Sequence, residues 1–136
     1  MTLKPLILVV DDEPAILKML QGSLEDEGFR VETLSEGNVV LEIIGKLIPD
    51  VVLLDIFMPH FDGMQMLKAI KQEYPQQHVM LISGFGTIQL AIQAMQHGAL
   101  GFIERPFTLD DVLEKLAFTK NVSLALPKKP QSNGHI

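Results

Sequence analysis

The chain has 136 residues, of which 47 % are apolar and none is cysteine. This length fits one domain with a sizeable core, and the lack of cysteine excludes disulfides, thiolate zinc sites and cysteine nucleophiles. Lys and Arg number 11 against 17 Asp and Glu, a formal net charge of −6. Such an acidic balance disfavours unspecific binding to nucleic acid or to an anionic membrane, so we expect neither as a partner.

The longest aliphatic run covers residues 6–10. It is far shorter than the roughly 20 residues that span a bilayer, and Asp11 and Asp12 follow it directly, unlike the core of a signal peptide. We therefore expect a soluble protein with a cytoplasmic location.

Short aliphatic runs alternate with longer amphipathic stretches along the chain. The runs, which we predict to be strands, cover residues 6–10, 29–34, 51–54, 79–82 and 101–103. Runs of Val, Ile and Leu without polar alternation are typical of parallel strands that are buried on both faces.

Between these runs, apolar residues recur every three or four positions, which predicts five helices with one buried face each. The five stripes begin at Ile16, Val40, Met64, Ile88 and Leu109. Pro14 suits a first helical turn, Gly28 and Gly98 suit left-handed helix ends, and Thr108 suits a helix start. Five strand–helix cycles predict an α/β fold, a parallel sheet covered by helices on both faces.

The last residues differ in composition from the rest of the chain. From about residue 127 onward they are rich in proline, lysine and polar side chains. We therefore expect one domain over residues 1–124 and a linker or disordered tail over residues 125–136.

Polar residues follow four of the five predicted strands. In chain order they are Asp11 with Asp12 and Glu13, then Asp55, Ser83 and Arg105. The carboxyl ends of parallel strands meet at one edge of the sheet, where open α/β folds bind their ligands. We therefore expect these side chains to lie close together.

The residue types at this edge suit phosphoryl chemistry. Asp11, Asp12 and Asp55 offer hard oxygen ligands for Mg²⁺, which also relieves the repulsion between neighbouring carboxylates. Asp55 stands alone at a strand end, so we favour it as the nucleophile that would form an aspartyl-phosphate. Mg²⁺, the Ser83 hydroxyl and the Arg105 cation would neutralise the phosphoryl oxygens.

Each of these residues also has a simpler interpretation. Asp12 or Glu13 fits a helix N-cap, and Asp55 fits the start of a turn. Ser83 fits an ordinary strand-to-helix turn, and Arg105 fits a solvated side chain. Their joint occurrence after four strands of one predicted sheet favours a phosphate and magnesium site.

Four separated motifs carry a family resemblance: LILVVDDEPAI, VVLLDIFMPHFDGM, VMLISGFGTIQLAIQAMQHGA and GFIERPFTLDDVLEKL. With them the chain resembles the receiver domain of two-component response regulators over about residues 5–122, and is most similar to the nitrogen-regulation activator type. The resemblance implies a flavodoxin-like (βα)5 fold, a doubly wound parallel sheet with strand order 2-1-3-4-5. It also implies a sensor histidine kinase or phosphotransfer protein as partner, and a homodimer through the face of the fourth helix, fifth strand and fifth helix.

The same resemblance implies a role for each site residue. Asp55 would be the phosphoacceptor of a signalling switch that promotes its own phosphotransfer and dephosphorylation but is not otherwise an enzyme. The implied Mg²⁺ ligands are Asp11, Asp12, Asp55 and the backbone carbonyl of Phe57. Ser83 would be the switch hydroxyl and Phe102 the switch aromatic.

One position departs from the family pattern, because Arg105 stands where a lysine usually precedes the proline. Arginine keeps the positive charge but is bulkier and grips phosphate differently, so we expect slower phosphorylation or weaker coupling. An interaction module that works without phosphate therefore stays open as an alternative. A magnesium-dependent phosphatase is disfavoured, because Phe57 stands where a second carboxylate would serve as general acid. Phe57 and Phe85 could instead shield a phosphoryl group from water.

Overall fold

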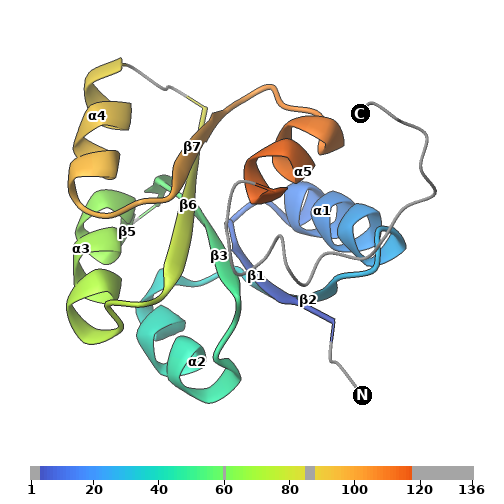
Figure 1. Cartoon of the computed structure of the whole chain (residues 1–136), viewed down its shortest axis with the longest axis horizontal. Coiled ribbons are helices and arrows are strands. Elements are labelled where there is room, and N and C mark those ends of the chain that lie inside the picture. The colour runs from blue at the N-terminus through green and yellow to red at the C-terminus, as the bar shows by residue number, and fades with distance from the viewer. Residues whose placement is uncertain (1–3, 60, 85–87, 118–136) are drawn as a thin grey trace.

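The computed structural model of the chain describes residues 4–59, 61–84 and 88–117. Figure 1 shows how the helices and strands are arranged. The elements are β1 (Leu6–Val10), α1 (Pro14–Asp26), β2 (Arg30–Leu34), the 3-10 helix η1 (Gly37–Val39), α2 (Val40–Leu47), β3 (Val51–Asp55), β4 (Phe57–Met58), β5 (Phe61–Asp62), α3 (Gly63–Glu73), β6 (His78–Ser83), α4 (Ile88–Gln96), β7 (Gly101–Glu104) and α5 (Leu109–Ala117).

A five-stranded sheet with the order β2-β1-β3-β6-β7 forms the centre of the molecule, and all of its pairings are parallel. In chain order these are the five predicted strands, so the expected flavodoxin-like order 2-1-3-4-5 is confirmed. Every residue of β1 and β3 is buried. Burial on both faces explains why these strands are continuous aliphatic runs.

The helices cover both faces of the sheet, with α1 and α5 on one face and α2, α3 and α4 on the other (Figure 1). Successive residues of β1 alternate between two cores, because side chains along a strand point to opposite faces. On the α1 and α5 face, Ile7 packs in the same core as Leu20 and Leu116. On the other face, Leu8 packs in the same core as Ile44 and Leu67.

The structure adds a short antiparallel hairpin, β4 with β5, that the sequence does not predict. It also shifts strand ends by one residue: β2 begins at Arg30, and β3, β6 and β7 continue to Asp55, Ser83 and Glu104. These extensions matter, because they make Asp55 and Ser83 the last residues of their strands rather than parts of the following loops.

The helix ends follow the expected chemistry. Gly28 and Gly98 have φ values of 99° and 95°, the left-handed conformation that glycine adopts without steric cost. The Thr108 hydroxyl accepts a hydrogen bond from the Asp111 N–H, and the Asp111 carboxylate accepts one from the Thr108 N–H. Within the described residues, no helix is both long and apolar enough to cross a bilayer. The expected tail, residues 125–136, lies outside them.

Candidate functional site

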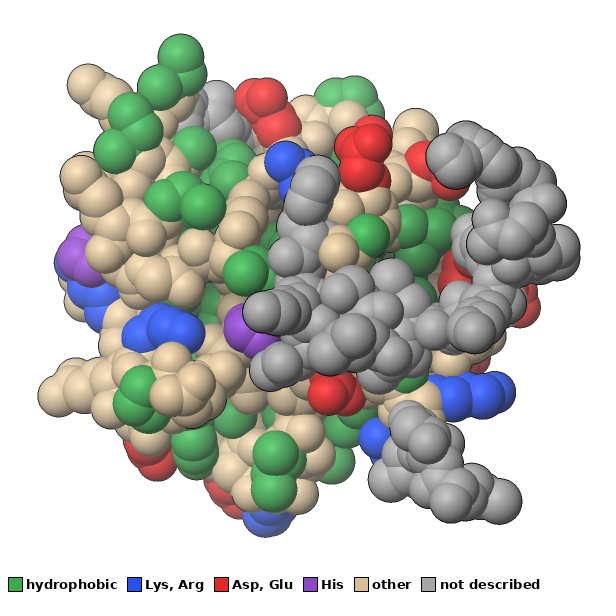
Figure 2. Space-filling model, viewed as in Figure 1, with side chains coloured by type: hydrophobic (Ala, Val, Ile, Leu, Met, Phe, Trp, Pro, Cys, Tyr) green, Lys and Arg blue, Asp and Glu red, His purple; other side chains and the backbone are tan. Residues whose placement is uncertain are grey.

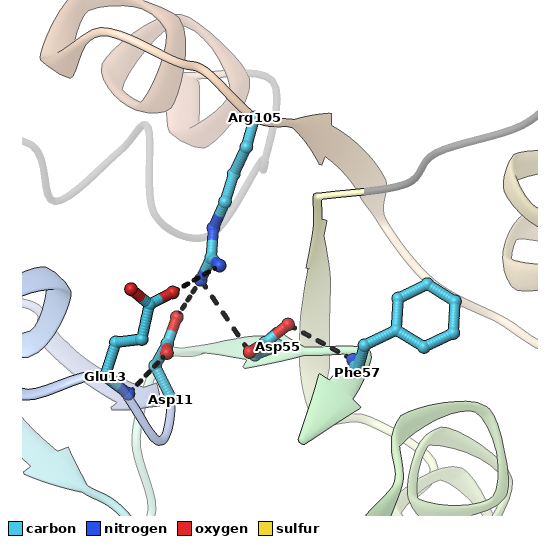
Figure 3. A network of polar contacts seen from close by, with 5 residues as sticks. All are labelled: Asp11, Glu13, Asp55, Phe57 and Arg105. Carbon is cyan, nitrogen blue, oxygen red and sulfur yellow. Dashed lines mark hydrogen bonds and ion pairs between the residues drawn. The ribbon is translucent and has the colours of Figure 1, made fainter. Parts of the chain in front are cut away.

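Four strands deliver polar residues to one edge of the sheet. Asp55 ends β3 and Ser83 ends β6, while Asp11 and Arg105 stand one residue beyond β1 and β7. Val10 lies opposite Leu54 in the parallel register, so the next residues, Asp11 and Asp55, emerge side by side. Figure 3 shows Asp11, Asp55 and Arg105 converging from their separate strands.

Three carboxylates form a compact acidic cluster. Asp11 and Asp55 are 0 % and 1 % exposed, and Asp12 is partly buried. One oxygen from each of the three residues lies within 4.8 Å of the others. Asp12 also lines a groove of about 510 Å³, so this member of the cluster is reachable from solvent. A set of carboxylate oxygens in reach of one another suits Mg²⁺, which prefers hard oxygen ligands.

Backbone N–H groups orient two of these carboxylates. Oδ1 of Asp55 accepts a hydrogen bond from the Phe57 N–H at 3.2 Å, and Oδ1 of Asp11 accepts one from the Glu13 N–H at 2.9 Å. Asp55 therefore does begin a local turn, as its simpler interpretation holds. In both residues the turn uses Oδ1 and leaves Oδ2 facing Arg105.

Arg105 is the cation of the cluster. Its Nη2 forms an ion pair with Oδ2 of Asp11 and lies 3.7 Å from Oδ2 of Asp55, while its Nη1 donates to Oε1 of Glu13 at 2.9 Å. The Arg105 backbone N–H donates to the Ser83 carbonyl at 2.8 Å, which ties the residue to β6. Only 21 % of the side chain is exposed, so the interpretation of Arg105 as a solvated side chain is wrong.

Burial dominates the ionisation of the two inner carboxylates. It raises the pKa of Asp55 to about 6, helped by the negative charges of Asp11 and Asp12 and opposed by the Phe57 N–H and Arg105. Burial also raises the pKa of Asp11, against the Glu13 N–H and Arg105. A buried carboxylate is costly to charge without a partner, so the site favours further positive charge at neutral pH.

The remaining predicted residues lie at different distances from the cluster. Ser83 is fully buried at the end of β6. Phe102 lies in β7, opposite Leu81 of β6, and packs against the core on the α2, α3 and α4 face. The structure therefore does not bring its ring to the carboxylates. The Phe57 ring is half exposed and points away from Asp55 (Figure 3). Phe85 lies outside the described residues.

Two residues contribute to the site in ways that the sequence does not predict. Glu13 reaches Arg105 across 92 positions of the chain, a contact without a local sequence signal. Gly63 begins α3, and its N–H donates to the Ile56 carbonyl at 3.1 Å. A Cβ atom at Gly63 would lie 2.4 Å from the Ile56 Cα, so only glycine lets α3 approach the residue after Asp55 this closely.

Comparison with known proteins relates this chain to response regulators. Residues 7–117 match the family model described as the response regulator receiver domain. The nitrogen assimilation regulatory protein NtrX of Azorhizobium caulinodans is 42 % identical over 106 residues, which cover 76 % of this chain and 23 % of that protein. The DNA-binding transcriptional regulator NtrC of Escherichia coli is 34 % identical over 131 residues, which cover 95 % and 28 %. The chain thus spans about a quarter of the length of these relatives.

Solved structures agree. NtrX from Brucella abortus is 36 % identical, with a TM-score of 0.79 over 89 % of this chain and 28 % of that one. A chain of the CheX–CheY–BeF3–Mg²⁺ complex from Borrelia burgdorferi is 30 % identical, with a TM-score of 0.79 over 83 % and 87 %. The chain therefore belongs to the response regulator receiver domain family, and is the receiver domain of a two-component response regulator.

Proposed function

We propose that Asp55 is the phosphoacceptor of this receiver domain, and that a sensor histidine kinase or phosphotransfer protein is the donor. The observation that carries the proposal is the buried Asp55 beside two further carboxylates and the Arg105 cation at the carboxyl edge of the sheet. In the transfer, an Asp55 oxygen forms a bond to phosphorus while the bond from phosphorus to the donor histidine nitrogen breaks. The nitrogen keeps the electron pair and regains a proton from solvent.

Asp11, Asp12, Asp55 and the Phe57 carbonyl would hold Mg²⁺, which supplies positive charge to the phosphoryl oxygens when bound. The acidic cluster supports this assignment, because its carboxylate oxygens are close together. Arg105 already faces Asp55 at 3.7 Å and would neutralise a second side of the phosphoryl group. We assign the Ser83 hydroxyl as a further donor to a phosphoryl oxygen.

Phosphorylation would act as a switch by favouring one of two conformations. In this proposal Ser83 moves toward the phosphoryl group, Phe102 follows, and the face formed by α4, β7 and α5 changes its partner preference. Figure 2 shows hydrophobic side chains gathered over α4, and Ile88, Ile92 and Met95 are the large exposed ones in that helix. This face is our candidate for a homodimer contact. We place the domain at residues 1–124 and a linker at residues 125–136.

A second function keeps the receiver fold but needs no phosphate. Arg105 already pairs with Asp11 and Glu13, so part of the acidic charge is neutralised without a phosphoryl group. In that case the chain would be an interaction module whose partner binding is indifferent to Asp55→Asn.

Incubation with Mg²⁺ and acetyl phosphate, followed by intact-mass analysis, tests the proposal. We expect one added phosphoryl group, lost in Asp55→Ala and retained in Asp26→Ala, an exposed aspartate of α1. Arg105→Lys, measured beside them, should react at least as fast as wild type. A wild type that gains no phosphoryl group with Mg²⁺ present would overturn the switch and favour the interaction module.

A further inference from the structure

Glu13 has an unusual place at the start of α1. It occupies the N-cap position, where short polar side chains often accept hydrogen bonds from the first helical N–H groups, yet its side chain makes no cap hydrogen bond. Its carboxylate extends instead to Arg105, whose Nη1 donates to Oε1 at 2.9 Å. The pair therefore joins the start of α1 to the end of β7.

Arg105 divides its hydrogen-bond donors unevenly. Nη1 forms an ion pair with Glu13 and Nη2 forms one with Asp11, both at the β1 side of the site. Oδ2 of Asp55 lies farther away, 3.7 Å from Nη2. Its Nε is buried and has no hydrogen-bond partner within the described part of the chain. A guanidinium has five N–H donors in a rigid fork, and a buried donor without a partner is unfavourable. The observed arrangement thus leaves part of the guanidinium unused.

A phosphoryl group on Asp55 would offer three acceptor oxygens and added negative charge next to this guanidinium. Arginine binds such groups through strong, charge-assisted and often bidentate hydrogen bonds. The Glu13 end of the Glu13–Arg105 pair is exposed, at 57 % of its side chain against 21 % for Arg105, so solvent weakens this pair relative to the one between Arg105 and the buried Asp11. The guanidinium therefore forms stronger hydrogen bonds when it exchanges Glu13 for the phosphoryl oxygens. The exchange costs Glu13 little, because solvent already hydrates its carboxylate.

We propose that Glu13 is a positioning residue that holds Arg105 in a resting position, and that a phosphoryl group on Asp55 competes with Glu13 for the guanidinium. The inference rests on the proposed function, because it assumes that Asp55 is the phosphoacceptor. Its consequence is that Glu13 lowers the affinity of the site for a phosphoryl group.

Titration with beryllium fluoride and Mg²⁺, a phosphoryl mimic that needs no turnover, measures this affinity in the full chain. Glu13→Gln should tighten binding by about two- to fivefold, the range of an exposed ion pair. Glu42→Gln is the matched control, because Glu42 pairs with Lys46 at 3.1 Å on the exposed side of α2. It loses the same charge and should leave the dissociation constant unchanged.

A second background separates competition from a general charge effect. In Arg105→Gln, the additional change Glu13→Gln should not tighten binding, because no guanidinium remains to be released. Tightening of equal size in both backgrounds would show that Glu13 acts only by its negative charge, and would overturn the proposal.

A measurement without ligand tests the resting pair by itself. The ¹⁵N resonance of the Arg105 Nε–H should show a lower heteronuclear NOE in Glu13→Gln than in wild type, because the side chain loses the ion pair at Nη1 and keeps only the one between Nη2 and Asp11. An unchanged NOE would overturn the inference even if Asp55 is phosphorylated. Failure of wild type to bind beryllium fluoride would instead overturn the proposed function, so the two failures are distinguishable.

Discussion

Replacing Asp55 by asparagine should stabilise the unphosphorylated protein at neutral pH. Burial raises the pKa of Asp55 to about 6 in the folded protein, against an ordinary value of 3.8. At a pH between these two pKa values, the Asp55 carboxyl keeps its proton in the folded state but has lost it in the unfolded state. The stability that this group contributes therefore falls as pH rises through this window, and the loss is essentially complete by about pH 7, one unit above the folded pKa. Asparagine has a similar shape and carries no charge, so it avoids this loss.

The difference between the two pKa values sets the size of the effect. About two pH units correspond to an upper limit of about 3 kcal/mol at pH 7.5. Asparagine keeps an oxygen that can accept from the Phe57 N–H but places an amide near Arg105, so we expect a gain of about 1–2 kcal/mol. For a chain of this size that gain raises Tm by about 3–8 °C.

Urea unfolding and thermal scans in EDTA, from pH 4 to pH 8, measure the effect. The advantage of Asp55→Asn over wild type should be largest near pH 7.5 and should shrink toward pH 4, where both side chains are neutral in the folded state. Asp26→Asn controls for the general loss of one negative charge and should change stability by less than about 0.5 kcal/mol. Equal stability of wild type and Asp55→Asn at pH 7.5, or a gain that does not change with pH, would refute the linkage.

Three further predictions concern the elements around Asp55 and the proposed Mg²⁺ site. Gly63→Ala should lower the free energy of unfolding in urea by about 1–3 kcal/mol, because the new Cβ would lie 2.4 Å from the Ile56 backbone. Gly22→Ala in α1 is the control: a Cβ there would meet nothing within 4 Å, so this change should stabilise the protein by about 0.5–1 kcal/mol. Asp62→Ala should cost about 1 kcal/mol, because Asp62 caps α3 by accepting from two N–H groups; an unchanged urea midpoint would contradict this. The Mg²⁺ dissociation constant, measured by calorimetry, should rise about tenfold per pH unit below pH 6 as Asp55 is protonated, and a constant value from pH 7 to pH 5 would contradict it.

The sheet could be predicted from the sequence because its strands are buried on both faces. The run at residues 6–10 is β1 without any shift, since all five of its residues lie in the core. β2 lies at the edge of the sheet and exposes Arg30 and Glu32, so its aliphatic pattern is weaker and its predicted start is one residue off. The convergence of Asp11 and Asp55 follows from parallel topology alone, because adjacent strands end at the same edge.

Features that depend on a few atoms could not be predicted in the same way. β4 and β5 have two residues each, too few to show the alternation by which a strand is recognised. The approach of Gly63 to Ile56 depends on the exact path of the loop after β3, and a glycine at the start of a helix is compatible with many such paths. The direction of the Phe57 ring also depends on that loop, and nothing in the local sequence specifies it.

The ion pair between Arg105 and Glu13 also could not be predicted from the sequence. It depends on arginine standing where the family usually has lysine. A lysine ammonium is a compact point charge, whereas the guanidinium fork reaches Asp11 and Glu13 through two different nitrogens at once. The contact with Glu13 therefore depends on arginine at this position. In an Arg105→Lys background, Glu13→Gln should change the affinity for beryllium fluoride by less than it does in wild type, by isothermal titration calorimetry. An undiminished effect of Glu13→Gln beside lysine would show that the forked geometry of Arg105 does not hold Glu13, and that the two residues interact through charge alone.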